Sequence, residues 1–469
     1  MVTKNNKPSK LEDETSPKWK MKDIRHPSQL LAVAPFEHYM YADDSAMYPM
    51  TVHIRFWFRG QFNKNQFMKA LEQVLPEHPL LQATMHGQKW WPRFLLRWKV
   101  HQSVTLPWVD WDLQGREYRF PNNQPNIDLR NEIGIRLFIR ESENRTELLV
   151  TFHHAVSDGK GIFNFIEHLL AQYSELLGGP KRAGLTNQHL LYRRSFFGLT
   201  TIDRLCRLWR DLFVLLKFFS MVPISLGRSS VSSSRTVPTN TLAVARGALT
   251  EQELGNLKNV AKGSQASVND VLLKILFLVI FDWNNKNEIK SARQRVTIAV
   301  PVCMRGKLFA MMPASNFVSM HVLHVSNKIL KKPNELLKHI NGIMKFVRAF
   351  EMGHTLVFFT SILGQIPFGL SSFFRLPMSK ASVVLTNLGV PFLDSHLVNF
   401  DGKLASTGVI LEHLETLPPI RDRTNASISI NSYDKSLQFT MRYNENVFTE
   451  VNALEFLKEY IGRLRDLHL

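Results

Sequence analysis

Residues 133–180 constrain the fold more than any other stretch of the chain. They read IGIRLFIRESENRTELLVTFHHAVSDGKGIFNFIEHLLAQYSELLGGP. Two apolar runs around the polar residues 141–145 predict a β-hairpin. After two adjacent histidines, apolar residues recur at helical spacing until the Gly-Gly-Pro at 178–180, which predicts a helix. The helical positions are Ile162, Phe165, Ile166, Leu169, Leu170, Tyr173 and Leu177. This part of the chain therefore combines strands and a helix.

Strands and helices intermix elsewhere as well. Residues 50–57 alternate as a strand does, and Phe67, Leu71 and Val74 mark one face of a helix that ends near Pro76. The second half contains helices at ASVNDVLLKILFLVIFDW, at 333–350 and at the end, with strands at RVTIAVPV, FVSMHVLHV, ASISINSY and LQFTMRY. Strand and helix do not alternate strictly, so we expect an α/β fold with mixed sheets, not a doubly wound parallel sheet.

The length of 469 residues is too great for one small core, and we expect two large lobes. Residues 1–23 are charged and lack an apolar stretch, which is typical of a disordered tail. The segment SLGRSSVSSSRTVPTN is rich in Ser, Thr and Pro, which is typical of a connection. The predicted division is an N-terminal lobe at 24–224, an inter-lobe linker at 225–241 and a C-terminal lobe at 242–469.

Charge and cysteine content narrow the functional classes. The only cysteines are Cys206 and Cys303, which excludes a disulfide framework and a paired-cysteine zinc site and favours a reducing compartment. The charged start does not resemble a secretory signal, so we expect a cytoplasmic protein. A formal net charge of +18 favours nucleic acid, an anionic membrane face or a phosphorylated substrate as partner. No recognisable nucleic-acid motif accompanies the charge, and we expect no nucleic-acid binding.

Two apolar stretches bear on membrane contact. Residues 355–374 carry no charged side chain, but Gly, Gln and Pro interrupt them, which favours buried helices or a tunnel wall over a spanning helix. Residues 202–220 form an amphipathic helix on a helical wheel. Its apolar side carries Leu205, Leu208, Leu212, Leu215 and Phe219, and its basic side carries Arg204, Arg207, Arg210 and Lys217. Such a helix lies either in a membrane interface or on its own protein with a solvated basic face.

The two adjacent histidines, His153 and His154, stand at the end of the second predicted strand. Successive side chains of a strand point to opposite faces, so the two rings diverge. This divergence disfavours a shared metal, and no third ligand stands at a supporting spacing, so we expect no metal. Asp158 stands where the chain turns into the helix, which predicts an N-cap, and Gly159 eases the turn.

The run from His153 to Gly159 resembles the HHxxxDG motif of the CoA-dependent acyltransferase superfamily. That superfamily includes the condensation domains of peptide synthetases, alcohol acyltransferases and wax ester synthase/diacylglycerol acyltransferases. Further segments resemble the family in order and spacing over roughly residues 30–465: FNKNQFMKALEQVLPEHPLLQA, IDLRNEIGIRLFI, SVNDVLL, PVCMRG and TNLG. The resemblance implies two lobes of the chloramphenicol acetyltransferase type, with a tunnel between them and the motif histidine at its centre.

The resemblance also implies a role for each residue of the motif. His154 is the general base, and an imidazole pKa of about 6.5 suits the taking and returning of a proton near neutral pH. Asp158 is structural and pairs with an arginine, for which Arg305 in PVCMRG is the candidate. Gly159 leaves room for a close approach of substrate or backbone. His153 is assigned to packing or hydrogen bonding.

Four supporting candidates have a structural alternative. Asn269 and Asp270 resemble the Asn-Asp helix start of the family, but Ser267 and Asp270 also fit a capping box. Asn387 and Gly389 resemble the Ser-Asn-Leu-Gly turn of the family, for which a plain turn is the simpler interpretation.

The resemblance implies acyl transfer from acyl-CoA, as a co-substrate, to a hydroxyl of a lipophilic alcohol or lipid acceptor, with no other cofactor. The basic charge suits the CoA phosphates and an anionic membrane surface. The Asp-Phe-Gly-Trp-Gly motif of plant acyltransferases is missing, as are the Pro-Leu-Trp and Asn-Val-Pro-Gly-Pro patterns of wax ester synthases, so the acceptor stays open. The alternatives are condensation-like amide or ester formation from an acyl group on an acyl carrier protein, and a non-catalytic membrane-surface module.

Overall fold

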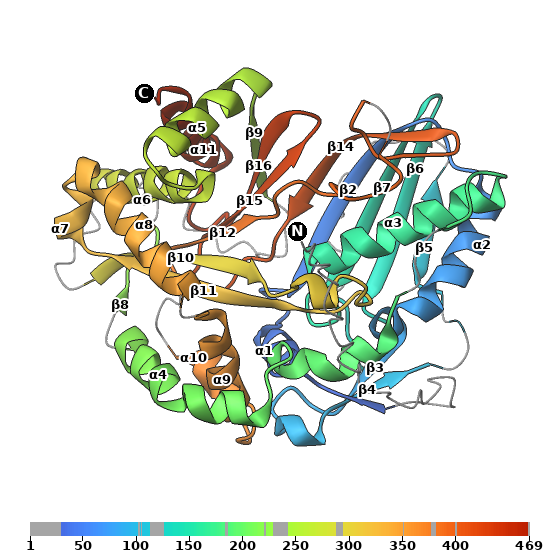
Figure 1. Cartoon of the computed structure of the whole chain (residues 1–469), viewed down its shortest axis with the longest axis horizontal. Coiled ribbons are helices and arrows are strands. Elements are labelled where there is room, and N and C mark those ends of the chain that lie inside the picture. The colour runs from blue at the N-terminus through green and yellow to red at the C-terminus, as the bar shows by residue number, and fades with distance from the viewer. Residues whose placement is uncertain are drawn as a thin grey trace, which may run out of the picture.

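The computed structural model describes residues 30–101, 104, 106–112, 126–182, 186–219, 222–227, 243–287, 294–349, 351–376, 381–398 and 401–467. The predicted tail at 1–23 and most of the predicted linker at 225–241 lie outside the described residues. Figure 1 shows two lobes side by side, each a sheet with helices packed on it.

The N-terminal lobe contains a sheet with the strand order β13-β14-β2-β7-β6-β5. Its strands are β2 (Thr51–Arg59), β5 (Trp108–Asp112), β6 (Ile135–Ser142), β7 (Arg145–His153), β13 (Ala405–Ser406) and β14 (Val409–Leu417). The predicted hairpin is confirmed, because β6 and β7 pair antiparallel along their whole length. The two predicted helices are confirmed as α2 (Lys64–Val74) and α3 (Gly159–Leu176), which pack against each other over this sheet (Figure 1).

Strand β14 comes from the second half of the chain but belongs to the first sheet. It pairs antiparallel with β2, from Ile410 opposite Arg59 to Leu417 opposite His53. Apolar residues of β14, such as Leu411, are fully buried in the N-terminal core. The predicted division into lobes does not anticipate this crossing, because an alternating pattern identifies a strand without identifying its neighbour. The crossing ties the two lobes together.

The C-terminal lobe contains a sheet with the strand order β11-β10-β12-β15-β16-β9, with β8 paired to β10. Its strands are β8 (Val222–Pro223), β9 (Val244–Leu249), β10 (Gln294–Cys303), β11 (Val318–Val325), β12 (Val383–Asn387), β15 (Ala426–Tyr433) and β16 (Ser436–Tyr443). β12 runs parallel to β10 and β15, whereas β10 and β11 are antiparallel. The predicted α/β fold with mixed sheets is therefore confirmed.

Helices cover the C-terminal sheet and form a second apolar core with it. They are α5 (Glu251–Gly263), α6 (Val268–Lys286), α7 (Asn327–Leu330), α8 (Pro333–Ala349) and α11 (Glu450–Arg465). α6 packs against both α8 and α11, which explains why apolar residues surround it on most sides.

Most of the remaining elements lie below the two large sheets in Figure 1. A small sheet has the order β1-β4-β3. Its strands are β1 (Leu30–Ala32), β3 (Ala83–His86) and β4 (Arg97–Val100). The neighbouring helices are α1 (Pro35–Asp43), α4 (Thr201–Phe219), α9 (Gly353–Leu363) and α10 (Gly369–Arg375). The 3-10 helices within the described ranges are η1 (Leu75–Glu77), η2 (Pro79–Gln82), η3 (Arg93–Leu95), η4 (Gln188–Phe196) and η5 (Lys307–Phe309).

The uncharged stretch at 355–374 forms most of α9 and α10, with a break between them. In the described part of the chain, no single helix has the length and apolar composition to cross a membrane. Two bent pairs, α5 with α6 and α8 with α9, reach that length and composition only when taken together.

Candidate active site

The loop that carries the HHxxxDG motif joins the end of β7 to the start of α3. β7 lies between β2 and β6, and its last residues bond to both sides: His153 N–H donates to Gly134 O and His154 N–H to Met50 O, at 2.9 and 2.7 Å. Asp158 caps α3, as predicted, by accepting a hydrogen bond from Gly161 N–H at 2.8 Å. A central strand and a capped helix therefore fix both ends of the loop.

The ring of His154 is held by its Nδ1 atom, which lies 3.2 Å from Ser157 O. A carbonyl oxygen only accepts, so this contact requires the proton on Nδ1 and leaves a lone pair on Nε2. The Asn316 Nδ2 atom lies 3.4 Å from the same Nδ1, but its amide donates to His154 O at 2.7 Å, which is the shorter and better bond. His154 is partly exposed between buried neighbours. The arrangement offers Nε2 as a proton acceptor.

The surroundings lower the pKa of His154 to about 4. Burial is the main cause, because it penalises the charged ring; Arg421 and His153 lower the pKa further, whereas Asp158 raises it. This differs from the predicted value near 6.5, which assumed an ordinary environment. The ring is consequently neutral near pH 7 and able to accept a proton, although it is a weaker base than an exposed histidine.

Asp158 and Arg305 form the ion pair that the resemblance implied. Arg305 Nη1 lies 2.6 Å from both carboxylate oxygens of Asp158, and each side chain is only 7% exposed. The carboxylate also accepts from Phe317 N–H at 2.8 Å, and Arg305 Nη2 donates to Ser315 O at 2.6 Å. These contacts bind the loop after β7 to residues 315–317, which precede β11 in the other lobe.

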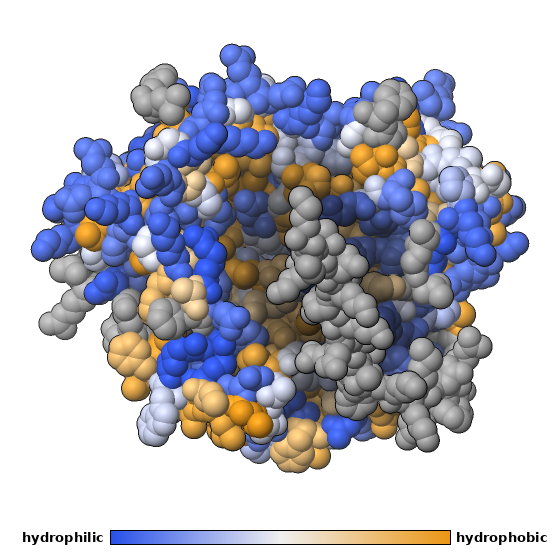
Figure 2. Space-filling view, viewed as in Figure 1, coloured by the Kyte–Doolittle hydropathy of each residue, from blue (hydrophilic) through white to orange (hydrophobic). Residues whose placement is uncertain are grey.

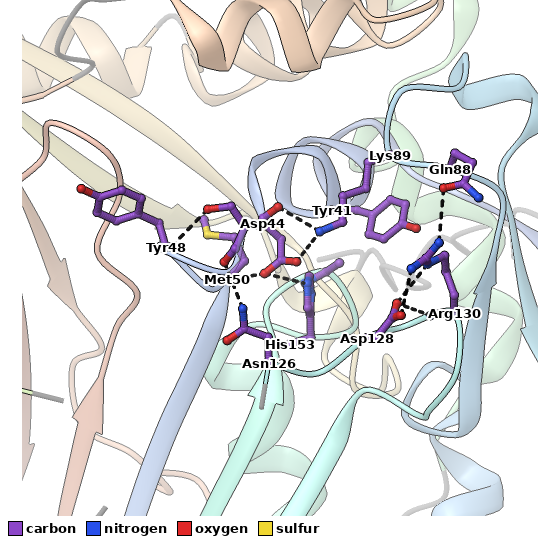
Figure 3. A network of polar contacts seen from close by, with 12 residues as sticks. Tyr41, Asp44, Tyr48, Met50, Gln88, Lys89, Asn126, Asp128, Arg130 and His153 are labelled. Carbon is purple, nitrogen blue, oxygen red and sulfur yellow. Dashed lines mark hydrogen bonds and ion pairs between the residues drawn. The ribbon is translucent and has the colours of Figure 1, made fainter. Parts of the chain in front are cut away.

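His153 takes partners on a different side from His154. Its Nδ1 accepts from Ala155 N–H at 3.1 Å, so the proton is on Nε2, which lies 3.7 Å from Asp44 Oδ1. Figure 3 shows this contact and the bonds from Met50 and Lys89 to the same carboxylate. Burial alone raises the pKa of Asp44, but His153 and Lys89 lower it to about 2. His153 thus braces the loop through a buried carboxylate.

Gly159 of the motif and Gly161 just after it permit close packing. A Cβ atom on Gly159 would lie 3.2 Å from Leu388 Cδ2, and one on Gly161 would collide with Ser157 Oγ and lie 3.1 Å from Arg305 Nη2. The tighter constraint therefore falls on Gly161, which the sequence analysis did not single out.

The other predicted site residues have structural partners. Ser267 and Asp270 form the predicted capping box of α6, where Asp270 Oδ2 accepts from Ser267 N–H at 2.9 Å and Asn269 occupies the first turn. Asn387 Oδ1 accepts from Gly389 N–H at 2.9 Å, and Gly389 has a φ of +70°. These contacts support the capping box and the plain turn, and the packing of Leu388 against Gly159 brings that turn beside the start of α3.

Asn316 and Arg421 are neighbours of His154 that the sequence analysis missed. Asn316 bonds the backbone of His154, and the charge of Arg421 lowers the pKa of its ring. Arg421 is itself held by Asp43, at 3.1 Å from its Oδ2, and by Tyr39 on α1. Both residues come from loops that show no recognisable sequence pattern. Asn316 lies 162 residues from His154 along the chain.

No group of three His, Cys, Asp or Glu side chains among the described residues is arranged to hold a metal ion. The role of His154 as base and the tunnel between the lobes stay predictions.

Comparison with known proteins identifies what this arrangement is similar to. The family model of the Condensation domain matches residues 36–292, which is more than half of the chain. Over 301 residues the chain is 24% identical to the uncharacterized protein Rv2305 of Mycobacterium tuberculosis. That alignment covers 62% of this chain and 66%, just under two thirds, of the relative.

Two solved structures have the same fold across nearly the whole chain. The first condensation domain of the calcium-dependent antibiotic synthetase, in complex with a substrate analogue, matches with a TM-score of 0.68 at 13% identity. That match covers 94% of this chain and 97% of the domain. The starter condensation domain of rhizomide synthetase RzmA, in complex with C8-CoA and Leu-SNAC, matches with a TM-score of 0.63 at 13% identity, over 93% and 94% of the two chains.

Proposed function

Because the chain belongs to the condensation-domain family, whose members transfer acyl groups, we propose that it is an acyltransferase that uses acyl-CoA and acylates a hydroxyl group. The acceptor in this proposal is a lipophilic alcohol or a lipid. His154 acts as the general base.

The observation that carries the proposal is the hydrogen bond from His154 Nδ1–H to Ser157 O. It fixes the tautomer and leaves the Nε2 lone pair for the acceptor hydroxyl. The Asp158–Arg305 pair and the Asn316 amide hold the loop from the other lobe, so the base keeps its place relative to both halves of the molecule.

The reaction then needs no covalent enzyme intermediate. His154 Nε2 takes the hydroxyl proton as the acceptor oxygen attacks the thioester carbonyl and forms the new C–O bond. When the tetrahedral intermediate collapses, the C–S bond breaks and the imidazolium returns the proton to the departing thiolate. The products are the ester and free CoA. A pKa lowered by burial favours this second step, because the imidazolium is then a stronger acid.

Two features support acyl-CoA as the donor. The net charge of +18 suits the phosphates of CoA. A structurally similar condensation domain was solved with C8-CoA. Because the similar structures include synthetase domains, the second candidate is ester or amide formation from an acyl group bound to a carrier protein. The third candidate function is that of a non-catalytic module that binds a membrane surface.

The test measures thiol release from a series of acyl-CoAs with long-chain alcohols, diacylglycerol and amines as acceptors. We expect turnover with a hydroxyl acceptor and a loss of about 10²- to 10⁴-fold in His154→Ala. The matched control is His189→Ala, which changes an exposed histidine outside the site and should retain full activity. Equal turnover of His154→Ala and wild type would reject the assignment of the base. Turnover only with an acyl-loaded carrier protein would establish the second candidate instead.

A further inference from the structure

Helix α4 leaves a row of large apolar side chains on the surface of the protein. This row, the α4 stripe, has exposed fractions between 64% and 80% and consists of Ile202, Leu205, Trp209, Phe213 and Leu216. The apolar side predicted from the helical wheel is displaced, because Leu208, Leu212 and Leu215 are half-buried against the protein. An apolar row of this length is unusual on a surface that water alone would cover.

The basic side of α4 is turned toward the protein. Arg207 Nη1 donates to Glu351 Oε2 at 2.6 Å, and the guanidinium of Arg204 lies 4.2 Å from the centre of the Phe196 ring. Asp211 is buried and accepts from Thr355 Oγ1 at 2.7 Å. The solvated basic face, one of the two alternatives from the sequence, is therefore wrong. These contacts fix the rotation of the helix and direct the α4 stripe outward.

A second group of exposed apolar side chains, the turn patch, lies on η3, on α9 and on the turns beside them. It consists of Trp90, Phe94, Leu95, Ile362, Ile366 and Phe368, which are 43–57% exposed. The rings of Trp90 and Phe368 stack with their centres 4.8 Å apart, which joins the segment at 90–95 to the turn between α9 and α10. Because α4 packs against α9, both groups border one edge of the molecule, where Figure 2 shows apolar colours along the lower side.

The charge of this edge indicates what covers it. The three segments that carry the two groups, 88–97, 186–219 and 353–376, contain ten Lys and Arg and two Asp. Three of the ten pair with acids elsewhere, Lys89 with Asp44, Arg194 with Glu37 and Arg207 with Glu351, and the rest leave the edge with a net positive charge. A row of aliphatic and aromatic residues on a convex helix about 28 Å long, with tryptophan in it and basic residues around it, fits the boundary between lipid headgroups and acyl chains. A protein partner would be expected to meet a concave or flat surface with paired polar groups at its rim.

We propose that the α4 stripe and the turn patch together dock on an anionic lipid bilayer, with the stripe inserted at the headgroup boundary. Arg193 and Arg375, which are exposed basic residues of the same segments, then face anionic headgroups, which add an electrostatic contribution that salt screens.

This docking edge is connected to the candidate active site through α1. Phe374 on α10 packs edge-on against Tyr39, at 4.9 Å between ring centres, and Arg421 lies over the same tyrosine at 4.9 Å. Arg421 is close enough to His154 to influence its ring. The docking itself does not depend on acyl transfer and is tested without it.

The experiment is flotation of the full chain with vesicles of phosphatidylcholine alone or with a roughly two-to-one mixture of phosphatidylcholine and phosphatidylglycerol. Wild type should float with the anionic vesicles, and Trp209→Ser/Phe213→Ser should lose at least tenfold in partitioning. The matched control is Leu393→Ser/Val451→Ser, which removes two exposed apolar side chains outside both groups and should float like wild type. Thermal unfolding of each variant checks that the fold is retained.

A second measurement identifies the face that binds. Cys206 is exposed on α4, so a polarity-sensitive fluorophore on it, in a Cys303→Ser background, should shift to shorter wavelength when anionic vesicles are added. Wild type that remains unbound, double variants that float equally, or a label that does not respond would each overturn the proposal. A wild-type dimer in light scattering that Trp209→Ser/Phe213→Ser converts to monomer would also overturn it, because a second copy would then cover the stripe.

Discussion

Removing either partner of the Asp158–Arg305 ion pair should destabilise the protein strongly. Both side chains are 7% exposed, and the carboxylate of Asp158 accepts hydrogen bonds from Gly161, Phe317 and Arg305. Removing one partner leaves a buried charge unpaired, which costs about 3–5 kcal/mol, and Asp158 is also an N-cap worth about 1 kcal/mol. We expect Asp158→Ala to lower the free energy of unfolding by about 4–6 kcal/mol and Arg305→Ala by about 3–5 kcal/mol.

The two substitutions should not add. In Asp158→Ala/Arg305→Ala no buried charge lacks a partner, so the loss should fall short of the sum of the single effects by about 2 kcal/mol or more. Urea unfolding followed by tryptophan fluorescence gives the four free energies. The control is Arg130→Ala, which breaks an exposed ion pair with Asp128 and should cost less than about 1 kcal/mol. Additive effects, or an Asp158→Ala variant as stable as the control, would refute the reasoning.

Two further predictions concern His154. Its pKa of about 4 means that the base is already unprotonated at neutral pH, so kcat/KM should be flat between about pH 6 and 8 and fall only as the pH drops toward 4. An inflection near pH 6.5 in the pH–rate profile would contradict the lowered pKa. Asn316→Ala removes the bond to His154 O and should lower kcat roughly tenfold with little change in KM, because positioning is lost and binding is not. Asn341→Ala, which removes a similar bond to Gln265 O, should leave kcat unchanged, and equal effects of the two substitutions would count against a positioning role.

The parts of the fold that the sequence predicted are those in which neighbours in the chain are neighbours in space. The hairpin of β6 and β7 and the helix α3 follow from local alternation, helical spacing and the cap at Asp158. The ion pair between Asp158 and Arg305 joins residues 147 positions apart, and only the resemblance to a family suggested it.

The remaining features depend on long-range packing that no local pattern records. Asn316 has no motif around it, and its role follows only from where the loop before β11 passes His154. The helical wheel identified α4 as amphipathic, but most of the apolar residues that it named are half-buried, and it could not say which face the protein covers. That choice depends on Glu351, which lies 144 residues from Arg207. The lowered pKa of His154 likewise follows from burial by both halves of the chain.

The crossing of β14 also limits how this protein can be divided. A fragment that ended before residue 243 would retain β2 but lose the strand that pairs with one of its edges. The exposed N–H and C=O groups of β2 would then recruit other strands, and such a fragment would be expected to aggregate. Split versions of the protein would therefore work only by complementation, with β14 as the strand that one fragment donates to the other.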